Sequence, residues 1–194
     1  MADGFELLTA AHAYLLAAVR GVPADGWGSA SPCSDWTVAQ VLNHARLDQQ
    51  ALTMKIGGTP PAGDPFAPGT EPGADPVAEL EAVLKDSAAA WESVRGAETV
   101  ETPVGTMPPA QGAAVAALDA AVHAWDIARG TGQDLPLDDD LAAGLHASTE
   151  GFVSFVRDSY GLFAPGVALA EGASPAAVFL AHTGRDAGWQ RPSA

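Results

Sequence analysis

The segment from residue 110 to residue 130 constrains the fold most, because its sequence is helical and apolar nearly all round. It reads AQGAAVAALDAAVHAWDIARG, and Gly130 and Gly132 are typical of a helix end. A helix without a polar face must be covered by other elements on every side. We therefore expect this helix to lie at the centre of the fold, with the remaining helices packed around it.

Apolar residues at three-and-four spacing predict further helices on both sides of this segment. They cover residues 5–20, 36–54, 76–95 and 137–158, with a short additional helix near 175–183. Ser34 or Asp35 is the expected N-cap of the second helix. The sequence thus predicts an all-α chain whose core is a four-helix bundle with additions.

Two stretches between the helices are expected to be irregular. Residues 57–76 are rich in glycine and proline, which predicts a long loop, and loops of this length are usually functional or mobile. Residues 97–109 are typical of a short extended or hairpin-like insertion. Because the chain has neither an internal repeat nor a low-complexity linker, we expect one domain over residues 1–194.

The charge balance narrows the range of partners. Nine basic and 24 acidic residues give a net charge of −15, which argues against nucleic acid and against an anionic membrane surface. A single cysteine excludes an intramolecular disulfide and a cysteine-rich zinc site. No signal-like segment is present and no apolar run reaches about 18 residues, so we expect a soluble cytoplasmic protein.

The central helix carries ionisable residues in an otherwise apolar sequence. Asp119 and His123 are four residues apart and therefore share one side of the helix, and Asp126 continues that side three residues later. Unpaired burial of such groups costs several kcal/mol, so they must find partners. A shared divalent ion and a structural hydrogen-bonded pair both meet this need, and the spacing leaves both interpretations open.

His44 is a third candidate ligand, on the second helix. Taken alone it is more typical of a partly buried core histidine. Asp48 follows it by four residues and could orient its second ring nitrogen. With Asp119 and His123 it makes a set of two histidines and one carboxylate, which leaves coordination positions open for water or substrate.

Other polar residues have two interpretations each. Cys33 lies just before the second helix and could be a nucleophile, but a packed structural thiol is favoured because no basic residue lies near it in sequence. Arg185 could anchor a substrate carboxylate, or could anchor the tail of the chain to an acidic surface residue, which is favoured. His12 and His146 are interpreted as packing or surface residues, and His182 stays open.

Three motifs, in this order along the chain, resemble signatures of the DinB-like superfamily. They are SPCSDWTV at 31–38 with VLNH at 41–44, GTMP at 105–108 with HAWDIARGTG at 123–132, and TGRD at 183–186 followed by Trp189. The closer resemblance is to the branch that contains mycothiol-dependent maleylpyruvate isomerase. The motifs cover most of the chain and are specific for the family, although not for one reaction.

This resemblance implies a DinB-like four-helix bundle with an extra C-terminal helix and short irregular or hairpin-like insertions. It also implies a divalent metal, most often zinc, held by His44, Asp119 and His123. We take Asp48 and Asp126 as candidate supporting residues around that metal. The isomerase has glutamate where this chain has Asp119. The implied activity is that of a metal-dependent S-transferase or isomerase-like enzyme, with a mycothiol-type thiol as cosubstrate and a small electrophile as substrate.

Two other classes of function stay open at this point. The bundle could be a non-catalytic module that binds a small ligand, with the polar triplet in a structural role. It could equally be a thiol-independent metal enzyme recruited to a biosynthetic pathway. A homodimer is compatible with the sequence, since helical bundles often bury an apolar outer stripe.

Overall fold

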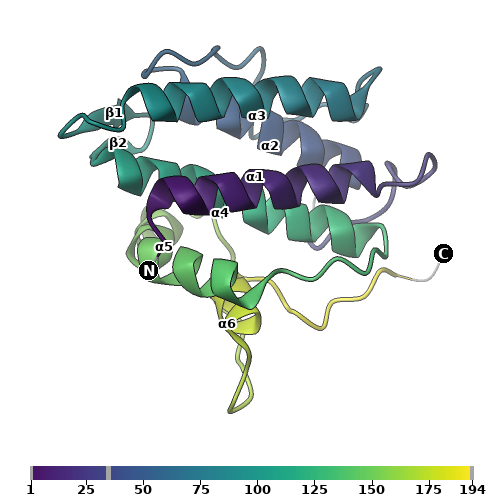
Figure 1. Cartoon of the computed structure of the whole chain (residues 1–194). Helices are drawn as coiled ribbons and strands as arrows, with labels where there is room; N and C mark the ends of the chain where they lie inside the picture. Colours follow the sequence, from purple (N-terminus) through teal and green to yellow (C-terminus); the bar gives the residue numbers. More distant parts are fainter. Residues whose placement is uncertain (1, 34–35, 193–194) are drawn as a thin grey trace.

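Four helices form the body of the structure, a computed structural model that describes residues 2–33 and 36–192 (Figure 1). They are α1 (Gly4–Arg20), α2 (Val38–Thr53), α3 (Pro76–Ser93) and α4 (Pro109–Gly130). Both α1 and α2 pack against α3 and against α4, so that α1 lies opposite α2 in the bundle. The predicted all-α class and the helical bundle are confirmed.

Helix α4 is the centre of the fold, as its sequence predicts. It packs against α1, α2 and α5, and 18 of its 22 residues are buried. Eight of the buried residues are alanines, whose small side chains let neighbouring helices approach closely. Asp119 is one of the few residues of this helix that keep some contact with solvent.

Side-chain caps determine where the first two helices begin. Asp3 and Glu6 form a reciprocal capping box at the start of α1. In α2 the N-cap is Thr37, which forms a capping box with Gln40, so this helix starts two residues later than expected. Thr37 also pairs with Ala30 in an isolated antiparallel bridge. The expected caps, Ser34 and Asp35, lie outside the described residues.

A short hairpin follows α3. Strands β1 (Val100–Thr102) and β2 (Gly105–Met107) pair antiparallel, with Val100 opposite Met107. This agrees with the hairpin-like insertion expected between residues 97 and 109. The hairpin contacts α4, which begins two residues after β2.

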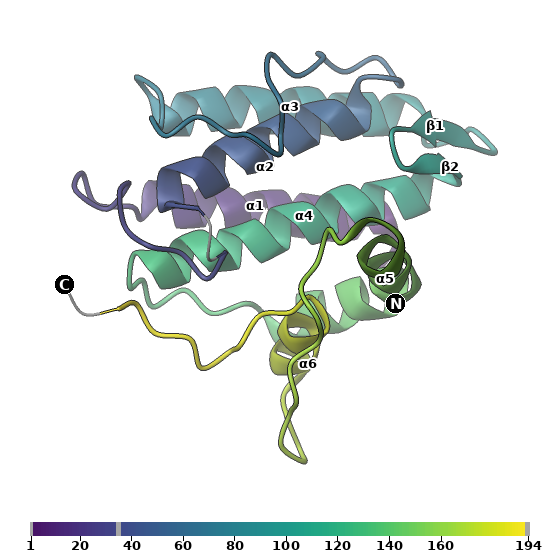
Figure 2. The ribbon, with the colours of Figure 1, turned by 180° about the vertical axis from the view of Figure 1, so that it is seen from behind.

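The glycine- and proline-rich loop between α2 and α3 is held by side chains of α2. It runs back along α2 and α3 (Figure 2). The amide of Asn43 donates to the carbonyls of Gly69 and Glu71, at 2.8 and 2.7 Å. Arg46 donates to the carbonyls of Pro72 and Pro76, at 2.8 and 2.7 Å. These bonds give the irregular backbone the partners that a helix or sheet would otherwise supply.

Two further helices lie outside the bundle. Helix α5 (Asp139–Tyr160) packs against α4 and α1, and α6 (Pro175–His182) packs against α5. After α6 the chain returns to α4, where Arg129 donates to the carbonyl of Trp189 at 2.7 Å (Figure 2). None of the helices in the described part of the chain is long and apolar enough to span a membrane.

Gly112 of α4 gives a direct test of this packing. A Cβ at this position would lie 2.4 Å from Cη2 of Trp91, a fully buried side chain of α3. We expect Gly112→Ala to lower the free energy of unfolding by about 1–3 kcal/mol, because the buried indole cannot move away without repacking. Urea unfolding followed by circular dichroism measures the change.

Gly151→Ala is the matched control for this substitution. Gly151 also lies within a helix, but a Cβ there would have no neighbour within 4 Å. Alanine should therefore stabilise this position by up to about 1 kcal/mol through its higher helix propensity. A Gly112→Ala variant as stable as the parent chain would contradict the described contact between α3 and α4.

Candidate metal site

The three candidate ligands meet between α2 and α4. His44 comes from α2, whereas Asp119 and His123 lie one turn apart on α4. Nε2 of His44 lies 3.7 Å from Oδ1 of Asp119, and Nε2 of His123 lies 3.4 Å from the same oxygen. One ligand atom from each residue can be chosen so that all lie within 4.8 Å of one another. Within the described residues no other histidine, cysteine and carboxylate group has this geometry.

The second ring nitrogen of each histidine is held by a hydrogen bond that points away from the cluster. Nδ1 of His44 donates to the carbonyl of Pro65 at 2.8 Å, and Nδ1 of His123 donates to Oδ2 of Asp126 at 3.1 Å. A carbonyl oxygen can only accept, so His44 carries its proton on Nδ1 and keeps the Nε2 lone pair toward Asp119. Metal-binding histidines are held in this way, and two imidazole nitrogens with one carboxylate suit a divalent ion.

Asp48 has a different place from the one expected. The expectation that it orients the second nitrogen of His44 is not met, because the Pro65 carbonyl occupies that nitrogen. Oδ2 of Asp48 lies instead 3.6 Å from Nε2 of His44, the nitrogen that faces Asp119. The loop after α2 covers the other side of the imidazole, so Asp48 borders the ligand face of the cluster.

Asp126 and Arg185 form a buried ion pair behind His123. Nη2 and Nε of Arg185 lie 2.9 and 3.4 Å from the two oxygens of Asp126, whose side chain is fully buried. Nη1 of Arg185 donates to the carbonyl of Thr183 at 2.9 Å. Arg185 therefore anchors the C-terminal segment. Its partner is a buried carboxylate, whereas a surface carboxylate was expected. Each guanidinium nitrogen has a protein partner, which favours the anchoring role over that of a substrate anchor.

The two histidines of the cluster differ in pKa. Burial, together with the nearby charge of His123, lowers the pKa of His44 to about 4. Burial also disfavours the charged form of His123, but the hydrogen bonds and charges of Asp119 and Asp126 outweigh it and raise its pKa to about 9. Without a metal the cluster therefore holds a proton on His123, between two carboxylates.

The carboxyl groups around the cluster also differ in pKa. Burial and the nearby charge of Asp119 raise the pKa of Asp48 to about 8. For Asp119 itself burial is outweighed by the hydrogen bond from His123, and its pKa lies below the usual range. The Arg185 guanidinium likewise outweighs burial at Asp126 and lowers the pKa of that carboxyl. The two carboxylates that contact His123 thus favour their charged forms.

Gln49 belongs to the site and was missed by the sequence analysis. Its side chain is fully buried, and its Nε2 donates to the Ala116 carbonyl at 2.9 Å and to Oδ2 of Asp119 at 3.4 Å. Its Oε1 accepts from Nε2 of His12 at 2.9 Å and from Ser87 Oγ at 3.0 Å. All four bundle helices thus contribute to one polar layer beside Asp119. Gln49 lies among the apolar residues on the buried face of α2. A polar side chain at such a position is the sequence feature that could have indicated its role.

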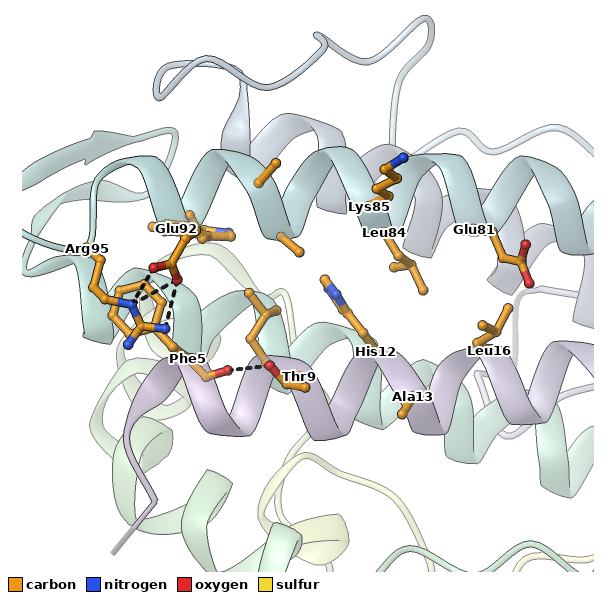
Figure 3. Close-up of a pocket in the computed structure, with 14 residues that line it drawn as sticks. Phe5, Thr9, His12, Ala13, Leu16, Glu81, Leu84, Lys85, Glu92 and Arg95 are labelled. Carbon is orange, nitrogen blue, oxygen red and sulfur yellow. Dashed lines mark hydrogen bonds and ion pairs between the residues drawn. The ribbon is translucent and has the colours of Figure 1, made fainter.

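The remaining candidates are not members of the ligand set. His12 points from α1 toward α3, beside a groove of about 570 Å³ between these helices (Figure 3). None of the three candidate ligands lines this groove, so volume alone does not locate the site. Cys33 is half-buried and packs against the core, and the fold brings it near the Arg185 guanidinium, a basic residue distant in sequence. The rings of His146 and His182 are 5.1 Å apart, between α5 and α6.

The fold and this cluster define a helical bundle with a two-histidine, one-carboxylate centre. The chain belongs to the family of the mycothiol maleylpyruvate isomerase N-terminal domain, whose model matches residues 8–128. The resemblance described from the motifs is thereby confirmed. The matched residues include the three candidate ligands and end before Arg185.

Two relatives from Mycobacterium tuberculosis are similar to the chain. They are the uncharacterized protein Rv0738 of strain H37Rv and the uncharacterized protein MT0763 of strain CDC 1551. Each is 32% identical over 147 residues, which make up 74% of this chain and 74% of the relative. No solved structure matches the chain significantly.

The pKa values predict how the stability of the metal-free chain depends on pH. The pKa of His123 is about 9 in the folded chain and 6.5 without its partners, so between these values the folded state binds more protons. The free energy of unfolding should therefore fall as pH rises from about 6.5 to about 9. The raised pKa of Asp48, about 8, should likewise make the free energy of unfolding fall with rising pH until that pH is reached. Urea unfolding in the presence of a chelator measures this.

His123→Gln should make this decline shallower, since the variant cannot hold the extra proton of His123 and only the contribution of Asp48 remains. His146→Gln is the control, because His146 lies outside the cluster and should leave the profile unchanged. A metal-free chain whose stability is constant or rises over this interval would show that His123 does not hold the proton.

Proposed function

We propose that this chain is a metal-dependent S-transferase or isomerase-like enzyme that joins a mycothiol-type thiol to a small electrophilic substrate. The observation that carries the proposal is the convergence of His44, Asp119 and His123, each histidine with its second nitrogen already bonded to an outer partner. Membership of a family named for a mycothiol-dependent isomerase supports the choice of thiol.

Nε2 of His44, a carboxylate oxygen of Asp119 and Nε2 of His123 are the atoms that would hold the metal. This nitrogen and oxygen set suits zinc, and three protein ligands leave a position for a small molecule. When bound, the divalent ion would supply Lewis acidity that lowers the pKa of a thiol. The pKa of His44, at about 4, keeps its imidazole neutral and available as a ligand at neutral pH.

Other residues of the chain have roles around this centre. Asp48 is the carboxyl group beside the ligand face that is not in the ligand set, and once a bound cation lowers its raised pKa its oxygen can accept the proton that a thiol loses. Trp36 and Phe66 flank His44, with ring centroids at 4.6 and 6.2 Å. Phe66 is 62% exposed and is carried by the loop after α2, so it offers an apolar surface to a substrate.

Metal content tests the first step of the proposal. We expect the wild-type chain to bind about one zinc ion after reconstitution, and His123→Ala to bind it at least about ten-fold more weakly, because a direct ligand is lost. Elemental analysis and titration against a coloured chelator measure this. His146→Ala keeps the cluster and should bind like the wild type. Equal and negligible metal in wild type and His123→Ala would refute the site.

Thiol consumption tests the second step. The zinc-loaded chain, given mycothiol and a panel of small electrophiles, should consume thiol at a rate that falls to background when a chelator removes the metal. His44→Ala should lose the activity and His146→Ala should keep it. A fully loaded chain that consumes no thiol with any electrophile would contradict the transferase proposal and favour a ligand-binding module or a thiol-independent enzyme.

A further inference from the structure

The segment after α6 contributes a residue that reaches the metal site from behind. This segment lies outside the residues that match the family domain, which end at 128. We infer that Arg185 is a positioning residue of the metal site: it fixes Asp126, and Asp126 holds the imidazole of His123. The inference rests on the proposed function, since it concerns how firmly the chain holds the metal ligand.

One carboxylate oxygen connects the arginine to the ligand. Oδ2 of Asp126 accepts from Nη2 of Arg185 at 2.9 Å and from Nδ1 of His123 at 3.1 Å. Nε of Arg185 lies 3.4 Å from the other oxygen, so the guanidinium faces both oxygens of the carboxylate. The carboxylate cannot rotate without breaking a bond to one of its partners, and the ring of His123 is therefore held with Nε2 toward Asp119.

The arginine is itself held in place by the turn that follows α6. Its backbone N–H donates to the carbonyl of Leu180 at 2.8 Å, and its Nη1 donates to the carbonyl of Thr183 at 2.9 Å. The guanidinium is therefore oriented by the fold of the segment and does not depend on the carboxylate for its direction. A preformed donor of this kind can fix a partner group at little cost in conformational entropy.

The buried negative charge of Asp126 requires a positive partner, which Arg185 supplies. The side chain of Asp126 has no exposure to solvent, and a buried carboxylate without a counter-charge costs several kcal/mol. Once the metal is bound, His123 has to be a neutral ligand and cannot supply that counter-charge. Arg185 is then the cation that bonds Asp126, and it keeps the carboxylate as an acceptor for Nδ1 of His123.

The test compares metal affinity in matched arginine variants. Changing groups that hold a metal ligand typically weakens binding by about ten- to a hundred-fold, and we expect this increase in the zinc Kd for Arg185→Met. The visible spectrum of bound Co²⁺ should change in the same variant, because the orientation of His123 changes. A loss of stability alone would move neither readout in a folded protein.

Arg129→Met is the matched control. Arg129 donates to the Trp189 carbonyl at 2.7 Å, so it holds the same segment without hydrogen bonding to Asp126. Its substitution should leave the zinc Kd within about two-fold of wild type. If Arg129→Met weakens binding as much as Arg185→Met, the effect comes from detachment of the segment and the inference is overturned.

A double-mutant cycle shows whether Arg185 acts through Asp126. Arg185→Met should have no further effect on the zinc Kd in an Asp126→Asn background, because the group through which it acts is already neutral. That pair also removes both buried charges, so the comparison stands even if Arg185→Met alone fails to fold. A further loss of affinity in the double variant overturns the inference.

The outcomes also separate this inference from the proposed function. A wild-type chain that binds no zinc after reconstitution overturns both. A wild-type chain that binds zinc, together with a folded Arg185→Met variant of unchanged Kd and unchanged Co²⁺ spectrum, overturns only the role of Arg185.

Discussion

The burial of ionisable side chains on an otherwise apolar helix is the constraint on which the rest of this structure depends. Helix α4 lies at the centre of the fold and carries Asp119, His123 and Asp126 along one side. Each of these groups would strongly destabilise the folded chain if it were left unpaired. The neighbours of α4 therefore supply polar partners at defined positions as well as apolar surface, and these partners determine how the other elements are arranged around it.

The partners come from two directions, and His123 lies between them. On one side Asp119 meets Gln49 and His44 of α2, and here the ligand atoms face each other. On the other side Asp126 meets Arg185 of the C-terminal segment. The division has a chemical consequence: one nitrogen of His123 is committed to a carboxylate with its own counter-charge, which leaves the other nitrogen for a ligand. Residues of the family domain supply the side with the ligand atoms. The segment beyond that domain supplies Arg185, which pairs with Asp126 on the other side.

Much of the fold could be predicted because its signals are local. The apolar periodicity of α4, the glycines at its end and the four-residue spacing of Asp119 and His123 need only the geometry of a single helix. The start of α2 was predicted less well, since the capping box of Thr37 and Gln40 competes with nearby polar residues that look equally suitable. Gln49 was missed because a glutamine on an apolar face shows its role only when the partners on three other helices are known.

By itself the sequence determined the helices, the apolar character of α4 and the residue types that share its polar side, because these follow from periodicity within short segments. Only the tertiary structure decided which nitrogen of each histidine faces Asp119, and which acid Arg185 pairs with. The carbonyl that orients His44 belongs to Pro65, 21 residues away, and the cation that holds Asp126 lies 59 residues away. Such contacts depend on how loops and the tail close over the bundle, and no local pattern encodes the distance between groups so far apart in the chain.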